Sequence, residues 1–270
     1  MCTLLSVSRS AYYDWLNGPV SPRALEDAKL LKQIRDIFLT SKCCYGARRI
    51  CAALRNAGHR ISRSRVSRLM KLGQLFCKVK RKFRVTTDSK HDLPIAPNLL
   101  NRQFSAAQPN QKYVGDITYI WTNEGWLYLA VVIDLFSRRV VGYAIDKTMT
   151  AELVNYALSM AIWQRKPPKG LIWHTDRGSQ YASKSHRKLL KAHGIKQSMS
   201  RKGNCWDNAP SESFFHSLKT ECTYHLNFKK REEAKQAIFE YIQVFYNRKR
   251  LHSTNNYLSP NDYEVMMNAA

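Results

Sequence analysis

The chain has 270 residues, of which 44% are hydrophobic, which is enough for one main domain with a sizeable core and smaller flanking modules. Its 44 Lys and Arg residues outnumber its 20 Asp and Glu residues, and the formal net charge of +24 favours a polyanion such as nucleic acid as the partner over a membrane surface. No run of about 18 apolar residues occurs, which excludes a transmembrane helix, and the N-terminus lacks the pattern of a signal peptide.

The seven cysteines are odd in number and form no CxxC pair, which is typical of reduced thiols in the cytoplasm rather than of a disulfide framework. Cys222 and His225 have the spacing of half a zinc site. Because no second pair lies at finger-like spacing, we predict no structural zinc there.

Residues 1–84 predict a small helical domain. A short amphipathic piece is followed by a helix with apolar residues at helical spacing, and a second helix covers residues 47–56. Gly58 lies in a tight turn, and a third helix begins near Ser62 or Ser64, which are both good N-caps. Two helices joined by a short glycine turn have the outline of a helix-turn-helix.

The third helix and the residue just ahead of the turn's end are rich in arginine, a side chain that suits phosphates and guanine edges in a major groove. The predicted DNA-binding residues here are Arg60, Arg63, Arg65 and Arg68. The alternative is a solvated basic face on a small helical bundle.

Residues 85–110 predict a linker with three prolines, and a basic run at residues 78–84 precedes it. This stretch marks the predicted domain boundary. It could track along DNA or serve as a solvated tether.

Residues 111–225 predict an α/β domain with a mixed five-stranded sheet and flanking helices. Three runs at residues 113–121, 126–134 and 139–145 are rich in β-branched and aromatic residues and predict an antiparallel meander. A helix at residues 151–164 then leads to a fourth strand near residues 170–173, which we expect to run parallel to the first. Helices at 183–193 and 208–219 flank a fifth strand at 195–199, and residues 226–270 add a C-terminal helix and a basic tail. This order is that of the ribonuclease-H-like fold.

Two carboxylates are predicted to meet in this sheet. Asp116 lies in the middle of the first strand, where an unpaired carboxylate is costly to bury, and Asp176 follows the fourth strand. If the two strands are adjacent and parallel, the carboxylates lie side by side, and a hard divalent cation relieves their repulsion. Asp134, at another strand end, is interpreted as structural.

Glu212 is the third candidate, on the helix at residues 208–219. It shares a face with His216 and Lys219, while apolar residues lie on another face. The alternatives are a solvated helical glutamate, or the rival acids Asp207 and Glu221. Glu221 lies on roughly the opposite side of the helix from Glu212.

The motifs around these acids resemble those of a known family. Between Asp116 and Asp176 lie 59 residues, and between Asp176 and Glu212 lie 35. The segments that carry the likeness are Tyr45-Gly-Ala-Arg-Arg-Ile50, Asp116-Ile-Thr118, Val132-Ile-Asp-Leu-Phe-Ser-Arg138, His174-Thr-Asp-Arg-Gly-Ser-Gln-Tyr181, Asp207-Asn-Ala-Pro-Ser-Glu-Ser-Phe214, Tyr246-Asn-Arg-Lys-Arg-Leu-His252 and Ser259-Pro260. They resemble the DDE core of retroviral integrases, and more closely the OrfB half of bacterial insertion-sequence transposases. The likeness covers nearly the whole chain, although the N-terminal His/Cys zinc module of the retroviral proteins has no counterpart.

The resemblance implies a polynucleotidyl transferase that carries out metal-dependent 3′-end cleavage and strand transfer of an insertion element. It also implies Mg²⁺ or Mn²⁺, two ions per site, with Asp116 bridging them and Asp176 and Glu212 each holding one. Lys219 is expected to contact a DNA phosphate, and Arg177 lies in a turn that DNA approaches. For His174, a structural hydrogen bond is favoured over a place in the metal shell.

The implied partners are the terminal repeats of the element and its target DNA, with a homo-oligomer assembled on them. An upstream-frame DNA-binding protein or fusion half is a further partner, and the bacterial cytoplasm, with the nucleoid when DNA is bound, is the expected location. Two alternatives stay open: a DNA-binding regulator or inactive transposase remnant, and a nuclease without strand transfer.

Overall fold

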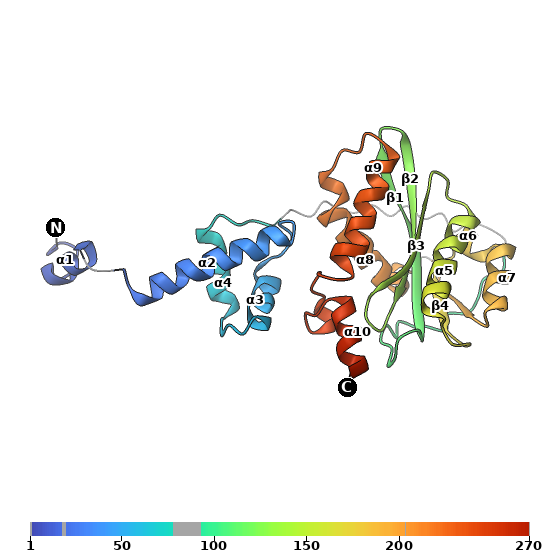
Figure 1. The fold of residues 1–270 in the computed structure, drawn as a ribbon, viewed down its shortest axis with the longest axis horizontal. Coiled ribbons are helices and arrows are strands. Elements are labelled where there is room, and N and C mark those ends of the chain that lie inside the picture. Colours follow the sequence, from blue (N-terminus) through green and yellow to red (C-terminus); the bar gives the residue numbers. More distant parts are fainter. Residues whose placement is uncertain (1, 18–19, 78–92, 203, 270) are drawn as a thin grey trace. The chain divides into compact units, whose positions relative to one another are not determined.

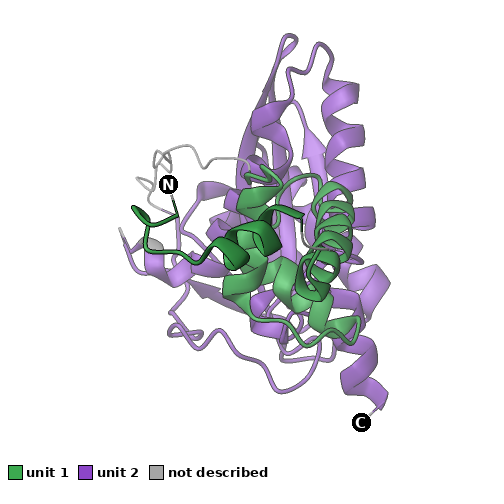
Figure 2. Ribbon diagram, turned by 90° about the vertical axis from the view of Figure 1, so that its left-hand side faces the viewer, with its two compact units in different colours: residues 1–77 green, residues 78–270 purple. Residues whose placement is uncertain are grey.

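The computed structural model describes residues 2–17, 20–77, 93–202 and 204–269, and the chain divides into two compact units, Met1–Cys77 and Lys78–Ala270 (Figure 2). The predicted basic run at residues 78–84 and the predicted boundary at residue 84 lie outside the described residues. Among the helices that the structure describes, none is both long and apolar enough to cross a membrane.

The first unit contains α1 (Arg9–Asn17), α2 (Pro22–Thr40), α3 (Ala47–Asn56) and α4 (Arg63–Leu72) (Figure 1). The Ser62 hydroxyl accepts a hydrogen bond from the Arg65 N–H, so Ser62 rather than Ser64 caps α4. Gly58 has a φ of +88°, which allows the chain to turn sharply after α3. The buried side chains that hold the helices together are Leu30, Ile34, Phe38, Ile50, Leu54, Val66, Leu69 and Met70.

The second unit is built on a five-stranded sheet in the order β3-β2-β1-β4-β5. Its strands are β1 (Lys112–Thr122), β2 (Gly125–Asp134), β3 (Val140–Asp146), β4 (Ile172–Thr175) and β5 (Lys196–Met199). The first three form the predicted antiparallel meander, whereas β4 runs parallel to β1 and β5 parallel to β4. The predicted mixed five-stranded fold is confirmed.

Helices cover both faces of this sheet (Figure 1). On one face lie α5 (Ala151–Arg165), α6 (Ser179–Ala182) and α7 (Lys184–Ala192), and on the other lie α8 (Ala209–Glu221) and α9 (Arg231–Phe239). A Cβ on Gly142 of β3 would lie 2.3 Å from the Ala157 carbonyl oxygen, so the absence of a side chain there lets α5 pack directly on the strand. The short helix α6 was not predicted as a separate element.

The C-terminal part is more segmented than the single predicted helix. α9 continues into a π-helix, η3 (Glu240–Tyr246), and α10 (Pro260–Ala269) follows. Three 3₁₀ turns complete the unit: η1 (Cys205–Asn208), η2 (Thr223–His225) and η4 (Ser253–Asn255).

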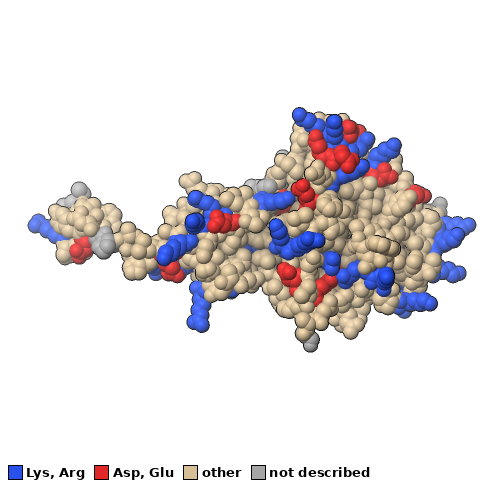
Figure 3. Space-filling model, viewed as in Figure 1, with Lys and Arg blue, Asp and Glu red and all other residues tan. Residues whose placement is uncertain are grey.

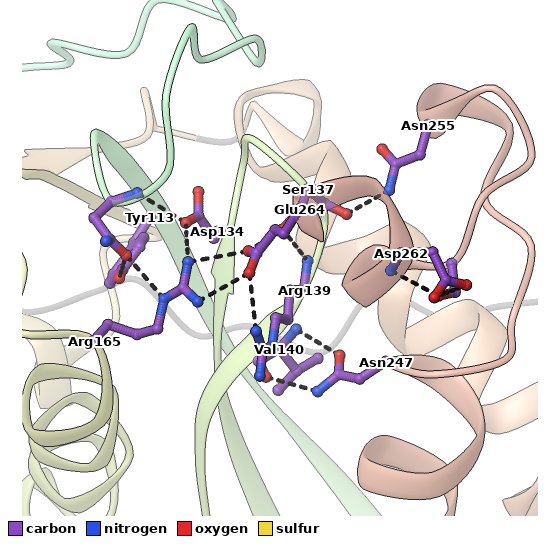
Figure 4. Close-up of polar contacts among 12 residues, drawn as sticks. Tyr113, Asp134, Ser137, Arg139, Val140, Arg165, Asn247, Asn255, Asp262 and Glu264 are labelled. Atoms are coloured by element: carbon purple, nitrogen blue, oxygen red, sulfur yellow. Dashed lines mark hydrogen bonds and ion pairs between the residues drawn. The ribbon is translucent and has the colours of Figure 1, made fainter. Parts of the chain in front are cut away.

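A polar network fastens α10 to the sheet (Figure 4). Arg165 of α5 makes two hydrogen bonds of 2.9 and 3.0 Å to the Glu264 carboxylate, and Arg139 adds an ion pair of 2.9 Å. Asp134 is fully buried and accepts hydrogen bonds from the Asn110 and Phe136 N–H groups. Asp134 is therefore structural, as its position in the sequence predicted.

Candidate active site

The register of β1 and β4 brings Asp116 next to Asp176. The parallel strands pair Lys112 with Ile172 and end their pairing at Val114 and His174, always with an offset of 60 residues. Asp116 and Asp176 lie two positions beyond that last pair and keep the same offset. Since side chains of a strand alternate between faces, both carboxylates leave the sheet on one side, where the two strands begin to separate.

Each carboxylate is held by a neighbouring backbone group. The Asp116 Oδ1 atom accepts a hydrogen bond of 2.8 Å from the Ile117 N–H, and the Asp176 Oδ1 atom accepts one of 2.9 Å from the Gly178 N–H. Burial raises the pKa of Asp116 well above its ordinary value, and the charges of Asp176 and Glu212 raise it further. The three acids therefore act on one another electrostatically.

Glu212 reaches this region from the first turn of α8. The helix is fixed by its apolar side, on which Phe214, Phe215 and Leu218 are buried. Glu212 itself is partly buried, and burial raises its pKa. The amphipathic pattern predicted for this helix therefore correctly separated its core side from its polar side.

The two rival acids have structural partners. Glu221 is buried and pairs with Arg250 at 2.7 Å, while the Tyr241 hydroxyl donates a hydrogen bond of 2.8 Å to it. Asp207 pairs with Arg201 at 2.7 Å and with Arg102 at 2.9 Å, and the bond with Arg201 is the main reason that its pKa lies below its ordinary range. Neither acid points to the region of Asp116.

Lys219 lies close to the acids but is mostly buried, with 8% exposure. Its ammonium nitrogen is 4.8 Å from the centroid of the Tyr119 ring. Burial lowers the pKa of Lys219, and the negative charge of Asp116 opposes that shift. Arg177, beside Asp176, donates a hydrogen bond of 2.7 Å from its Nε to the Ser200 carbonyl.

The predicted DNA-binding arginines of the first unit differ in their surroundings. Arg60 and Arg63 are exposed. The Arg65 side chain is only 20% exposed and pairs with Glu26 and Asp27 at 2.8 Å each, and Arg68 also pairs with Asp27. Sequence spacing could not reveal these pairs because both acids come from α2, and DNA contact by the four arginines stays a prediction.

His174 makes structural hydrogen bonds. Its Nδ1 atom is 2.8 Å from the Ser198 hydroxyl and its Nε2 atom is 3.4 Å from the Ser200 hydroxyl. Burial lowers the pKa of His174 to about 4, so the imidazole is neutral at physiological pH. This arrangement agrees with the structural hydrogen bond that was favoured from the sequence.

Several buried oxygen atoms around the acids lack a hydrogen-bond partner within the described part of the chain. They include the Tyr181 hydroxyl, the Asn208 Oδ1 atom and the Ser211 hydroxyl. Burial raises the pKa of Tyr181 and the charges of Asp116 and Asp176 raise it further, while the Asn208 amide donates a hydrogen bond of 3.4 Å to the Gly115 carbonyl. Sequence reasoning did not single out Tyr181 or Asn208, although both lie inside the motifs that carry the family likeness.

The donor chemistry fits a hard divalent cation. Asp116, Asp176 and Glu212 offer carboxylate oxygens, and the unpartnered oxygens nearby could accept hydrogen bonds from its water shell. In the described ranges, no three His, Cys, Asp or Glu side chains are already gathered to hold an ion. A cation would therefore have to draw the three carboxylates together.

Two glycines give the acids their room. A Cβ on Gly115 would lie 2.0 Å from the Trp173 ring, whose Nε1–H donates a hydrogen bond of 2.9 Å to His186. A Cβ on Gly178 would lie 3.1 Å from the Asp176 Oδ1 atom. The Gly178 position is therefore tight because of Asp176 itself, a reason that differs from the approach of DNA considered from the sequence.

Comparison with known proteins gives consistent matches along the chain. Residues 106–205 and 212–267 match models described as integrase core domain, and residues 24–83 match an HTH-like domain. The chain is 48% identical to the insertion element IS600 uncharacterized 31 kDa protein of Shigella sonnei, over 96% of both chains. It is 45% identical to transposase InsF for insertion sequence IS3A of Escherichia coli, over 98% of this chain and 92% of the relative.

Among solved structures, a chain of the simian T-cell lymphotropic virus intasome, in complex with PP2A regulatory subunit B56 gamma, has a similar fold. The TM-score is 0.51 with 18% sequence identity, and the match covers 77% of this chain and 68% of that chain. This likeness concerns the fold alone.

Proposed function

Because the chain belongs to the family of the IS3 insertion-sequence transposases, we propose that Asp116, Asp176 and Glu212 are its catalytic residues. The protein is a transposase, and its core is that of a polynucleotidyl transferase. The observation that carries the assignment is the offset of 60 residues between β1 and β4, which aligns Asp116 with Asp176. Glu212 completes the set from α8.

The three carboxylates are the proposed ligands of divalent metal, Mg²⁺ or Mn²⁺, with two ions per site. Asp116 would bridge the ions, and Asp176 and Glu212 would each hold one. Such ions, when bound, stabilise negative charge on the attacking and leaving oxygens of a phosphodiester. The raised pKa of Asp116 supports this role, because a cation offsets the repulsion that the acids exert on one another.

The proposed reaction has two phosphoryl transfers. A water oxygen attacks the phosphorus at the element's end, and the bond to the 3′ oxygen breaks, which frees a 3′-OH. That 3′-OH then attacks a phosphorus in a second strand, so one phosphodiester bond forms as another breaks. Neither transfer needs a covalent enzyme intermediate, and the enzyme acts by positioning and by stabilising charge.

The remaining assignments concern DNA and organisation. Proposed contacts to DNA are Lys219 and Arg177 near the acids, and Arg60, Arg63, Arg65 and Arg68 in the first unit. Proposed domains are residues 1–84 for DNA binding, 85–110 as linker, 111–225 as catalytic core and 226–270 as its C-terminal completion. The proposed setting is the bacterial cytoplasm, with a homo-oligomer on paired element ends and target DNA, and with an upstream-frame DNA-binding protein or fusion half.

The test compares the wild type with Asp176→Asn on labelled DNA that carries the ends of the element, in the presence of Mg²⁺. We expect wild type to nick and join these ends, and the substitution to lower both rates by at least about 100-fold, as does removal of one charge-stabilising group at a catalytic centre. Binding to the same DNA without metal should be retained.

Three other outcomes would contradict the proposal. A wild type that binds but neither nicks nor joins would be a regulator or inactive remnant. A wild type that nicks and never joins would be a nuclease. Full activity of Asp176→Asn would remove Asp176 from the catalytic set.

A further inference from the structure

The tip of the β1–β2 hairpin presents aromatic side chains to solvent. Trp121 and Trp126 are opposite each other in the strand register, with ring centroids 4.8 Å apart, and they are 56% and 44% exposed. Tyr119 lies beside Trp126 with its ring centroid at 5.0 Å. Aromatic side chains gathered on a surface mark an interaction site more often than single exposed apolar residues do.

The hairpin tip is held firmly by the segment that leads into α9. The Asn123 N–H donates a hydrogen bond of 2.9 Å to the Phe228 carbonyl. The Arg231 N–H donates one of 2.8 Å to Glu124, and the Arg231 Nε donates one of 3.3 Å to the Trp126 carbonyl. Because the indoles stand on a fixed backbone, a ligand that stacks on them pays little entropy for ordering the site.

The surroundings of the hairpin tip are basic. Lys229 and Lys230 are exposed, and Figure 3 shows basic and acidic side chains together at this end of the sheet. The Glu233 carboxylate accepts hydrogen bonds from the Lys229 and Lys230 N–H groups, so it is engaged by backbone groups. Aromatic side chains beside Lys and Arg are the combination with which proteins bind single-stranded nucleic acid.

A chain of contacts connects this surface to the acids. The ammonium group of Lys219 lies over the Tyr119 ring, and Lys219 interacts electrostatically with Asp116. Along β1, Asp116 and Trp121 are five residues apart, or roughly 17 Å at the rise of a strand. That span equals about five nucleotides at the roughly 3.4 Å rise of one DNA strand.

We infer that Trp121 and Trp126 form a stacking platform for an unpaired DNA base that lies within about five nucleotides of the phosphate held at Asp116. The base has to be unpaired because the faces of bases inside a duplex are covered by their neighbours. Lys229 and Lys230 contact the phosphates on either side of that base. The inference rests on the proposed function, since it places the reacting phosphate at the three acids.

The test measures binding of the full chain to two DNA probes of mixed sequence, with Ca²⁺ replacing Mg²⁺. One probe is a blunt duplex, and the other carries a five-nucleotide unpaired tail with one 2-aminopurine. We expect Trp126→Ala and Trp121→Ala each to weaken binding of the tailed probe roughly tenfold, the effect of losing one base–aromatic stack, and to abolish quenching of 2-aminopurine. Binding of the blunt duplex should change less than twofold.

Two sets of variants serve as controls. Trp126→Phe keeps an aromatic face and should restore most of the preference for the tailed probe. Trp163→Ala removes an indole that is 79% exposed on α5, away from the hairpin, and should leave that preference unchanged. Lys229→Ala and Lys230→Ala should each lower the slope of log affinity against log salt by about one, whereas the Trp variants should not.

The inference is overturned if both probes lose affinity equally, if Trp163→Ala has the same effect as the hairpin variants, or if those variants change the sedimenting mass but not the preference for the tail. Its failure can be told from that of the proposed function, because binding in Ca²⁺ requires no cleavage. If the wild type joins DNA and Trp126→Ala keeps the tail preference, the inference alone fails. If the wild type never joins DNA and Trp126→Ala still loses the tail preference, the proposed function alone fails.

Discussion

Tyr181 carries a hydroxyl that is 99% shielded from solvent and lacks a hydrogen-bond partner in the ranges that the structure describes. Such a group costs about 1–3 kcal/mol unless something else satisfies it. The ring itself is well packed, with centroids 6.2 Å from Trp173 and 5.6 Å from His186. The charges of Asp116 and Asp176 reach this phenol, so a water of the metal shell is a suitable partner.

We therefore predict that Tyr181→Phe lowers Mn²⁺ affinity by about tenfold or more, as the loss of an outer-shell partner does, while thermal stability without metal stays equal or rises. Titration calorimetry and thermal unfolding measure the two quantities. Tyr113→Phe is the matched control, because the buried Tyr113 hydroxyl donates to Asn110 and should affect stability alone. Unchanged Mn²⁺ affinity in Tyr181→Phe would contradict the prediction.

His186 gives the core a pH dependence. It accepts a hydrogen bond from Trp173 and is within 2.8 Å of the Asn155 carbonyl oxygen, and burial lowers its pKa from 6.5 to about 4. The folded-state pKa lies below the unfolded one, so the unfolded chain takes up the proton first. Its contribution to the free energy of unfolding, at most roughly 3 kcal/mol, is present above pH 6.5 and is lost as the pH falls towards 4.

The measurement is the melting temperature of the protein between pH 7 and pH 4.5, for the wild type and for His186→Gln. We expect the wild type to lose stability across this range and the substitution to flatten the slope. His174, with a pKa of about 4, contributes a similar slope in both proteins. Because carboxylates titrate in the same range, it is the difference between the two slopes that reports on His186, and equal slopes would refute the assignment.

At the scale of elements, the position of α8 depends on its C-terminal end as well as on its apolar face. Glu221 ends the helix, and the buried Arg250 holds it with bonds of 2.7 Å, while Arg250 also donates a 3.0 Å hydrogen bond to Ser217. Glu212 lies at the other end of the same helix. The pair therefore fixes the direction from which Glu212 approaches β1.

We predict that Arg250→Ala destabilises the second unit by about 3–5 kcal/mol, because it leaves the Glu221 charge buried and unpaired. Urea unfolding measures the loss. Lys235→Ala removes an exposed ion pair of 3.1 Å to Glu232 and is the control, with an expected cost below about 1 kcal/mol. Equal costs for the two substitutions would mean that the buried pair does not hold α8.

Elements with strong local signals were predictable from the sequence. The bounds of α3 follow from apolar spacing and Gly58, and the three meander strands follow from β-branched and aromatic runs. The offset that aligns Asp116 with Asp176 needed only the parallel crossover rule. By contrast, η3 has no signal in single residues, since a π-helix depends on the packing around it.

Long-range polar partners were not predictable. Arg65 and Glu26 are far apart in the sequence, as are Arg250 and Glu221, and no local pattern marks which charges will pair. The same limit hid the partnerless hydroxyl of Tyr181, because its state depends on what surrounds it after folding. The sequence could therefore predict the three acids but not how strongly each candidate cation is already engaged.

At the scale of the whole molecule, the net charge of +24 dominates interaction with DNA. Each phosphate neutralised by Lys or Arg releases counterions, so affinity falls steeply with salt. Figure 3 shows Lys and Arg side chains spread over the visible face rather than confined to one spot.

We predict that affinity for duplex DNA falls by about a thousandfold or more between 50 and 200 mM salt, as for a protein that contacts six or more phosphates. Fluorescence anisotropy over a salt series gives the slope. Asp176→Asn changes one charge of many and should have nearly the same slope. A fall of less than about tenfold would mean that few of the basic residues contact DNA.

The alignment of β1 with β4 also restricts how the gene can change in length. Loss of one codon between Lys112 and Asp116 would keep the reading frame but turn the Asp116 carboxylate to the opposite face of the sheet, since side-chain direction alternates at every residue. Loss of two codons would restore the face but draw the carboxylate back by roughly 7 Å from Asp176. Insertions and deletions that leave an active enzyme should therefore fall in turns such as residues 122–125, and not in the few codons that precede either aspartate.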